Sequence, residues 1–74
     1  MKNIMGLFPA RLKALRAEKG VKQSDMAELL NCTTGHYQKI EYGMVNIPTL
    51  SLVKLADYFG VSLDYLMGRR DERN

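Results

Sequence analysis

Residues 23–41 contain two short helical patterns separated by a break, and this arrangement restricts the chain to few folds. Asn31 opens the break, and asparagine tolerates a positive φ better than any residue except glycine. Thr33 follows and can cap the next helix with its hydroxyl. The apolar residues that share a face within each pattern are Met26, Ala27, Leu30, Tyr37 and Ile40. We therefore predict two helices that are joined by a tight turn and cross closely at the small Ala27.

This stretch resembles the helix-turn-helix of the lambdoid phage repressors and Cro proteins, and of the small bacterial regulators built on the same plan. In that family apolar residues lock the two helices together at fixed offsets, and a glutamine often opens the first helix. The residues that match these positions are Gln23, Met26, Ala27, Leu30, Cys32, Tyr37 and Ile40. The resemblance covers residues 8–67 and departs at the turn, where the family usually has glycine and this chain has Asn31.

The length and composition are those of one small soluble domain. The chain has 74 residues, of which 46% are hydrophobic and 26% charged. Its net charge of +3 favours a polyanionic partner without requiring one. No apolar run approaches the ~20 residues of a membrane span, and residues 1–7 are too short and interrupted for a signal peptide. With a single cysteine, Cys32, these features lead us to expect a cytoplasmic protein that does not act at membranes.

The chain outside this stretch predicts three more helices. The first opens at Phe8-Pro9 and ends at Gly20, because proline is tolerated at a helix start and glycine commonly ends helices. The fourth begins at Pro48 or Thr49 and ends at Gly60. A short fifth helix follows Ser62 as its N-cap. The residues expected to face the core from these helices are Phe8, Leu12, Leu15, Leu52, Val53, Ala56, Phe59, Leu63, Leu66 and Met67.

We thus predict an all-α, compact five-helix domain over residues 8–67. Residues 23–30 and 34–42 form its second and third helices. A segment of residues 1–7 precedes the domain. A polar tail of residues 68–74 follows it, and we expect this tail to fray because it has no apolar periodicity.

The exposed face of the third helix is the candidate binding surface. Once Tyr37 and Ile40 face inward, a step of 100° per residue leaves polar groups outside. The residues on that side are Thr34, Gly35, His36, Gln38, Lys39 and Tyr42. Such donors and acceptors fit the major groove of DNA, where Gln38 suits adenine and Lys39 suits guanine or a phosphate.

The family resemblance implies further roles. Residues 34, 35 and 39 match positions that commonly touch bases, so the third helix would be the one that reads the DNA sequence (the reading helix). Gln23 would bind a phosphate and brace a residue of that helix. The resemblance also implies a structural ion pair between Arg16 and Glu41. The implied DNA-binding set is Lys22, Gln23, Ser24, Thr33, Thr34, Gly35, His36, Gln38, Lys39, Tyr42 and Asn46.

The expected function is therefore sequence-specific binding of double-stranded DNA by a bacterial or phage transcriptional regulator, most simply a repressor. Family members usually act as homodimers on pseudo-palindromic operators whose half-sites lie about 34 Å apart. The residues that could form the dimer surface are Ile4, Met5, Leu7, Leu63, Tyr65 and Met67.

Two departures from the family pattern motivate a different class of function. Gly35 has no side chain with which to read a base, so either the backbone approaches DNA there or His36 and Lys39 do the reading. The loop of residues 44–47 is uncharged where the family often has Lys or Arg. The alternative is a protein-interaction module, or an antitoxin-like partner protein, that keeps the same fold.

Enzyme activity and cofactors are not expected. Cys32 and His36 are four residues apart, but two ligands do not make a metal site and the chain has no further His or Cys. Because the turn needs Cys32 inside while His36 faces outward, the two residues are also a poor nucleophilic pair.

Overall fold

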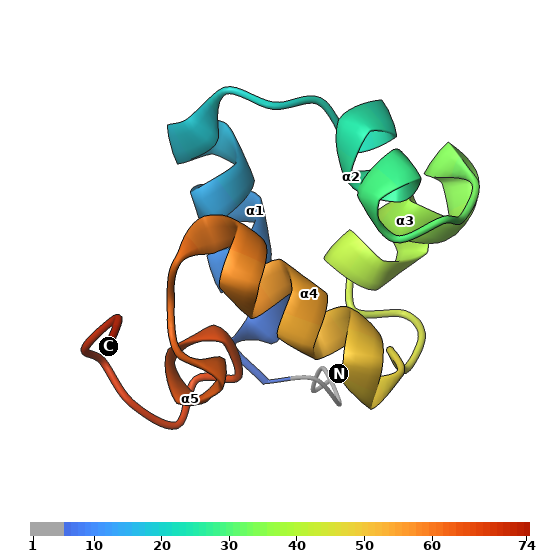
Figure 1. Cartoon of the computed structure of the whole chain (residues 1–74). Helices are drawn as coiled ribbons and strands as arrows, with labels where there is room; N and C mark the ends of the chain where they lie inside the picture. Colours follow the sequence, from blue (N-terminus) through green and yellow to red (C-terminus); the bar gives the residue numbers. More distant parts are fainter. Residues whose placement is uncertain (1–5) are drawn as a thin grey trace.

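Five helices pack around one core in the computed structural model, which describes residues 6–74 (Figure 1). They are α1 (Phe8–Lys19), α2 (Gln23–Leu29), α3 (Thr34–Glu41), α4 (Thr49–Phe59) and α5 (Leu63–Leu66). The described part of the chain contains no strand, so the predicted all-α, five-helix architecture is confirmed. Most of the predicted N-terminal segment, including Ile4 and Met5, lies outside the described residues. None of the helices in residues 6–74 has the length and apolar character needed to cross a bilayer.

Helix ends form where the local sequence predicts them. α1 ends at Gly20 with φ 71° and α4 ends at Gly60 with φ 67°, both in the left-handed region that glycine adopts without strain. The Thr33 hydroxyl accepts the His36 N–H at 3.1 Å. The Ser62 hydroxyl likewise accepts the N–H of Tyr65 at the start of α5. These caps satisfy backbone groups that the first turn of a helix leaves without partners.

The core joins residues from all five helices. Its largest fully buried side chains are Phe8, Leu12, Met26, Tyr37, Leu55 and Leu66. α2 packs against α3, while α1 contacts both α3 and α5. As a result, α2 and α3 lie together on one side of the molecule, and α5 with the C-terminus lies on the other (Figure 1).

The prediction for the buried face of α4 was partly wrong. Leu55 is fully buried, whereas Val53 is exposed. Leu52, Leu55, Ala56 and Phe59 follow the i, i+3, i+4, i+7 spacing of a helical stripe, and Val53 falls outside it. The buried stripe of α4 therefore contains Leu55 in place of Val53.

The prediction for α5 was also partly wrong. Leu66 is buried, but Leu63 is exposed and Met67 is only half-buried. Helical side chains lean toward the N-terminus of their helix, so Leu63, at the first position of α5, leans past the helix end.

The C-terminal tail is packed against the domain, and the expectation that it frays was wrong. The Arg73 guanidinium donates to both carboxylate oxygens of Glu18 on α1, at 2.9 and 2.6 Å. The Ser62 N–H donates to the Arg73 carbonyl at 2.6 Å, and Arg11 pairs with Asp71 at 3.1 Å. The hydrogen bonds from Arg73 hold the pKa of Glu18 below its usual range. The Arg73–Glu18 and Arg11–Asp71 partners are more than fifty residues apart in sequence, so no local pattern could reveal them.

Candidate nucleic-acid interface

The α2–turn–α3 unit is held by both its backbone and its apolar side chains. Asn31 has a φ of 57°, in the left-handed region that residues other than glycine rarely adopt. This conformation turns the chain between α2 and α3, as predicted. The Cys32 N–H donates to the Ala27 carbonyl at 2.9 Å, which closes the end of α2. The predicted apolar contacts are confirmed, since the following residues are buried or packed against the core: Met26, Ala27, Leu30, Cys32, Tyr37 and Ile40. The unit therefore presents α3 on a rigid support.

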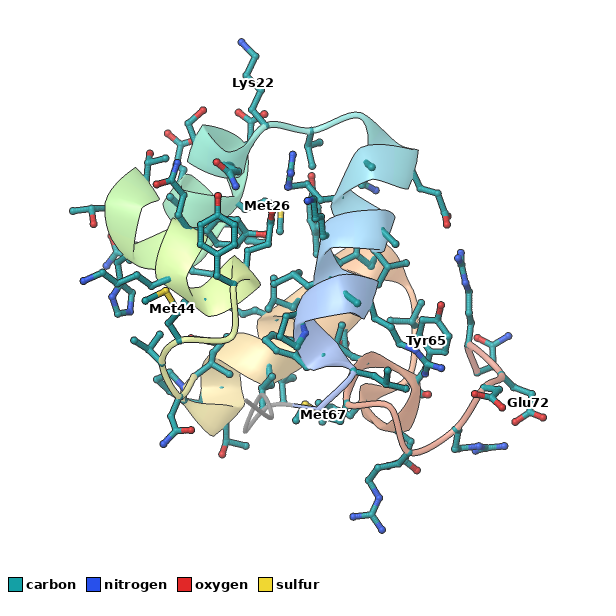
Figure 2. The ribbon with its side chains drawn as sticks, turned by 180° about the vertical axis from the view of Figure 1, so that it is seen from behind. Lys22, Met26, Met44, Tyr65, Met67 and Glu72 are labelled. Atoms are coloured by element: carbon teal, nitrogen blue, oxygen red, sulfur yellow. The ribbon has the colours of Figure 1, made fainter. Side chains whose placement is uncertain are left out.

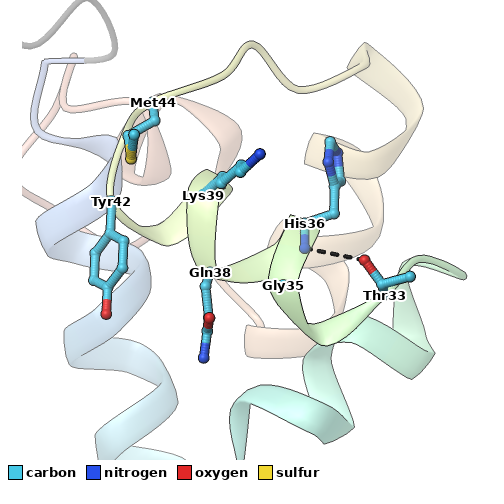
Figure 3. Close-up of a pocket in the computed structure, with 7 residues that line it drawn as sticks. All are labelled: Thr33, Gly35, His36, Gln38, Lys39, Tyr42 and Met44. Atoms are coloured by element: carbon cyan, nitrogen blue, oxygen red, sulfur yellow. Dashed lines mark hydrogen bonds between the residues drawn. The ribbon is translucent and has the colours of Figure 1, made fainter.

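The outer face of α3 contains a shallow hollow of about 630 Å³ (Figure 3). Gly35 has no side chain, so the helix backbone is bare at that residue of the lining. Figure 3 shows His36 and Lys39 pointing to one side of α3, and Gln38 and Tyr42 pointing to the other. The residues that line the hollow are Thr33, Gly35, His36, Gln38, Lys39, Tyr42 and Met44.

The remaining predicted residues surround this hollow. Ser24, Thr33 and Thr34 line a second depression of about 540 Å³ in front of the turn. Lys22 projects from the start of α2 (Figure 2), and Asn46 is exposed in the loop after α3. Neither Lys22 nor Asn46 lines either depression.

Met44 also lines the hollow, and the sequence reasoning did not select it. Its side chain is 67% exposed, which is unusual for a methionine. Residues 44–47 differ from the family pattern in their lack of charge, but that feature does not indicate that Met44 lies beside the outer face of α3.

A buried ion pair connects α1 to α3. The Arg16 guanidinium donates to both carboxylate oxygens of Glu41, with distances of 2.8 and 3.1 Å. Glu41 is only 3% exposed. The ion pair that the resemblance implied is therefore present, and it connects α3 to α1.

Two glutamines extend this pair into a chain of hydrogen bonds. Gln23 Nε2 donates to Glu41 Oε1 at 3.1 Å, and Gln38 Nε2 donates to Gln23 Oε1 at 3.0 Å. A carboxylate can only accept, so Gln23 must turn its amide nitrogen toward Glu41 and its oxygen toward Gln38. Gln23 thus braces Gln38 of α3, and Gln38 has one amide hydrogen and its oxygen left for other partners.

The charge of Glu41 is maintained by its neighbours. Burial by itself raises the pKa of Glu41, but the hydrogen bonds from Arg16 and Gln23 outweigh burial and hold the pKa below its usual range. Burial and the nearby carboxylate raise the pKa of the Tyr37 hydroxyl. Within residues 6–74 that hydroxyl has no partner at ordinary hydrogen-bond geometry. At neutral pH the network therefore contains one cation, one anion and a neutral phenol.

The start of α2 already contains a negative charge. The Asp25 carboxylate accepts the Lys22 N–H at 2.9 Å. Lys22 at the start of α2 and Lys39 on α3 are exposed cationic groups. An anionic partner is therefore attracted to these lysines, while the carboxylate of Asp25 weakens the attraction at the start of α2.

Comparisons with known proteins agree with this geometry. The chain matches the helix-turn-helix family over residues 12–66. It is 39% identical over 61 residues to YonR of Bacillus subtilis, an SPbeta prophage-derived uncharacterized HTH-type transcriptional regulator. Those 61 residues make up 82% of this chain and 56% of YonR. It is also 36% identical over 59 residues to the HTH-type transcriptional regulator ImmR of the same organism. Those 59 residues make up 80% of this chain and 46% of ImmR.

The chain thus spans about half the length of the curated relatives it matches. No solved structure gives a significant match to it. The match over residues 12–66 covers all of α2 and α3 and the turn between them. This chain belongs to the helix-turn-helix family of the Cro and lambdoid-repressor type.

Proposed function

We propose that this protein binds double-stranded DNA in a sequence-specific manner by placing α3 in the major groove. The observation that carries the proposal is the hollow on the outer face of α3 with its polar side chains. The turn at Asn31 and the buried Arg16–Glu41 ion pair hold α3 in place against α2 and α1. The major groove admits a helix and presents a distinct pattern of donors and acceptors for each base pair. α3 has hydroxyl, imidazole, amide and ammonium groups with which to read such a pattern.

The proposed contacts fall into two groups. Thr34, His36 and Lys39 contact base edges, with Gln38 beside them in its braced orientation. The backbone at Gly35 approaches the bases closely because no side chain intervenes. The residues proposed to contact the phosphates, at the borders of this surface, are Lys22, Gln23, Ser24, Thr33, Tyr42 and Asn46. Phosphate contacts orient the protein, while base contacts determine the preferred sequence.

We further propose that the protein is a transcriptional regulator that acts as a homodimer. Both relatives are described as HTH-type transcriptional regulators. A two-fold dimer would bring two α3 helices to half-sites about 34 Å apart on one side of the duplex. Leu7 and Leu63 are exposed apolar residues that could contribute to the dimer surface, with Tyr65 and Met67 half-buried nearby.

Selection of binding sites from a random duplex pool tests this function, followed by a salt titration on the enriched site. We expect a pseudo-palindromic sequence to be enriched and the affinity to fall as salt rises, because phosphate contacts release counterions. A chain that enriches no sequence and shows no salt-dependent binding would contradict the proposal. That result would favour the protein-interaction module, which shares the fold but needs no polyanion.

A further inference from the structure

We propose that Tyr37 is a positioning residue and a reserve donor for Glu41, whose hydroxyl replaces the Gln23 amide at that carboxylate when Gln23 turns toward a DNA phosphate. The reserve donor belongs to the inner side of α3 and needs no DNA. The exchange rests on the proposed function, in which Gln23 contacts a phosphate. The inference comes from the network around Glu41, where the Gln23 amide has two partners while the Tyr37 hydroxyl has none among residues 6–74.

Both ends of the Gln23 amide are occupied in the free protein. Nε2 donates to Glu41 Oε1 at 3.1 Å, and Oε1 accepts from Gln38 at 3.0 Å. These two contacts also fix the direction of the second amide hydrogen, because an amide presents its acceptor and its donors in one plane. A phosphate oxygen can only accept a hydrogen bond. A turn of the amide that aims its hydrogens at a phosphate therefore removes the donor from Glu41.

Glu41 is poorly placed to lose this donor. Its side chain is fully buried, and its Oε1 accepts from both Arg16 and Gln23. A buried carboxylate oxygen that loses a hydrogen bond cannot bind bulk water in its place, and a buried group left unsatisfied destabilises the fold. Contact between Gln23 and a phosphate would thus be opposed from inside the domain, unless another donor reached Glu41.

The Tyr37 hydroxyl is suited to be that donor. Tyr37 precedes Glu41 by four residues, about one turn of α3, so the two side chains share a face. Tyr37 is fully buried, and its hydroxyl has no hydrogen-bond partner in the part of the chain that the structure describes. Burial and the neighbouring carboxylate raise the pKa of this phenol, so it keeps its proton at neutral pH. Buried hydroxyls are seldom left without a partner, and a reserve role accounts for this one.

The charges beside the hydroxyl determine where it can donate. The charged groups that act on Tyr37 are Glu41 and Arg16. A guanidinium has only donors, whereas a carboxylate accepts through both oxygens, so Glu41 is the acceptor of the two. A rotation of the phenolic O–H, with a small shift of the side chain, restores the number of donors on Glu41. The Arg16–Glu41 pair stays intact, and Gln23 is released for an external partner.

The reserve donor is tested first in the free protein, by a cycle of two substitutions. Tyr37→Phe removes one oxygen and keeps the buried ring, while Gln23→Ala removes the present donor and favours the helix. We expect Tyr37→Phe to leave the unfolding equilibrium constant, measured in urea, unchanged in the wild-type background. In the Gln23→Ala background the hydroxyl donates to Glu41, so the same change should raise this constant about tenfold, the effect of one hydrogen bond to a charged group.

The exchange is then tested on the duplex enriched from the random pool. Tyr37→Phe should weaken binding about tenfold although the free protein keeps its stability, because Gln23 then leaves Glu41 without a replacement. In the Gln23→Ala background Tyr37→Phe should not weaken binding further. Tyr58→Phe is the matched control, since it removes the same oxygen from a half-buried ring that packs edge-on against Phe59 of α4. It should change neither the coupling nor the affinity.

The outcomes separate this inference from the proposed function. If Tyr37→Phe changes stability equally in both backgrounds, the reserve donor is overturned, because the hydroxyl is then either bonded already or never available to Glu41. If the coupling is present in the free protein but Tyr37→Phe binds the duplex like the wild type, the exchange is overturned while sequence-specific binding stands. Failure to bind any duplex overturns the proposed function and the exchange with it, and the urea cycle alone then decides whether Tyr37 is a reserve donor.

Discussion

Gln38 on α3 donates a hydrogen bond to Gln23 on α2, with 3.0 Å between Nε2 and Oε1. Gln23 in turn donates to Glu41, which Arg16 holds from α1. The buried carboxylate of Glu41 therefore orients the side chain of Gln38 on α3 through the amide of Gln23. The stability of this domain and the DNA-binding geometry proposed for α3 depend on the same contacts.

Gln23→Glu should destabilise the domain by about 1–3 kcal/mol, because it replaces the donor to Glu41 with a second carboxylate. Urea unfolding measures this loss. Ser24→Glu is the control, since it adds the same charge one residue along at an exposed position. Equal losses of unfolding free energy in both variants would show that the hydrogen bond from the Gln23 amide to Glu41 does not stabilise the fold.

Arg16→Ala should destabilise the domain by about 3 kcal/mol, because it leaves Glu41 buried without its cation. The value lies at the lower end for buried pairs, since the Arg16 side chain is 19% exposed. Lys13→Ala on the exposed face of α1 should change stability little. The double variant Arg16→Met with Glu41→Leu should recover much of the lost unfolding free energy. If it recovers none, the loss in Arg16→Ala comes from missing packing and not from the unpaired charge of Glu41.

The pH dependence of stability should report on Glu41. Its pKa in the folded protein lies below its ordinary value of 4.5, so the ionised form stabilises the fold. That contribution is complete above pH 4.5 and is lost as the pH falls through the lower, folded-state pKa. The difference in unfolding free energy between the wild type and Glu41→Gln should therefore be largest near neutral pH and shrink on acidification. A difference that stays constant would contradict the assignment.

The uncharged loop after α3 offers a test of the phosphate contacts. Asn46→Lys should raise the affinity for DNA and steepen the slope of log K against log salt by about 0.9, the effect of neutralising one more phosphate. Ala14→Lys, on the exposed side of α1, adds the same charge away from the surface. If both variants change the slope equally, Asn46 does not lie beside a phosphate.

The features that the sequence predicts best are those set by neighbouring residues. A positive φ at Asn31 and a cap at Thr33 follow from local chemistry, and both are present. The Arg16–Glu41 pair depends on contacts between helices, and only the resemblance to a known family implied it.

The parts that escaped prediction depend on how distant segments meet. The resemblance implied that Gln23 braces a residue of the third helix, but it did not identify Gln38 as that residue. This link requires a specific crossing of α2 and α3, which periodicity does not specify. The tail has no periodicity, yet Arg73 forms an ion pair with Glu18 because α5 directs the tail toward α1. Met44 lies in a loop, where no helical face indicates which way a side chain points.

The role of α3 as the reading helix is tested most directly by the binding of Lys39→Ala to the enriched site and to its single-base-pair variants, with Lys13→Ala as control. We predict that Lys39→Ala loses about 1–3 kcal/mol of binding free energy and no longer discriminates at one base pair, while Lys13→Ala binds like the wild type. If Lys39→Ala keeps the affinity and the base preferences of the wild type on every duplex, α3 does not read DNA in the proposed way.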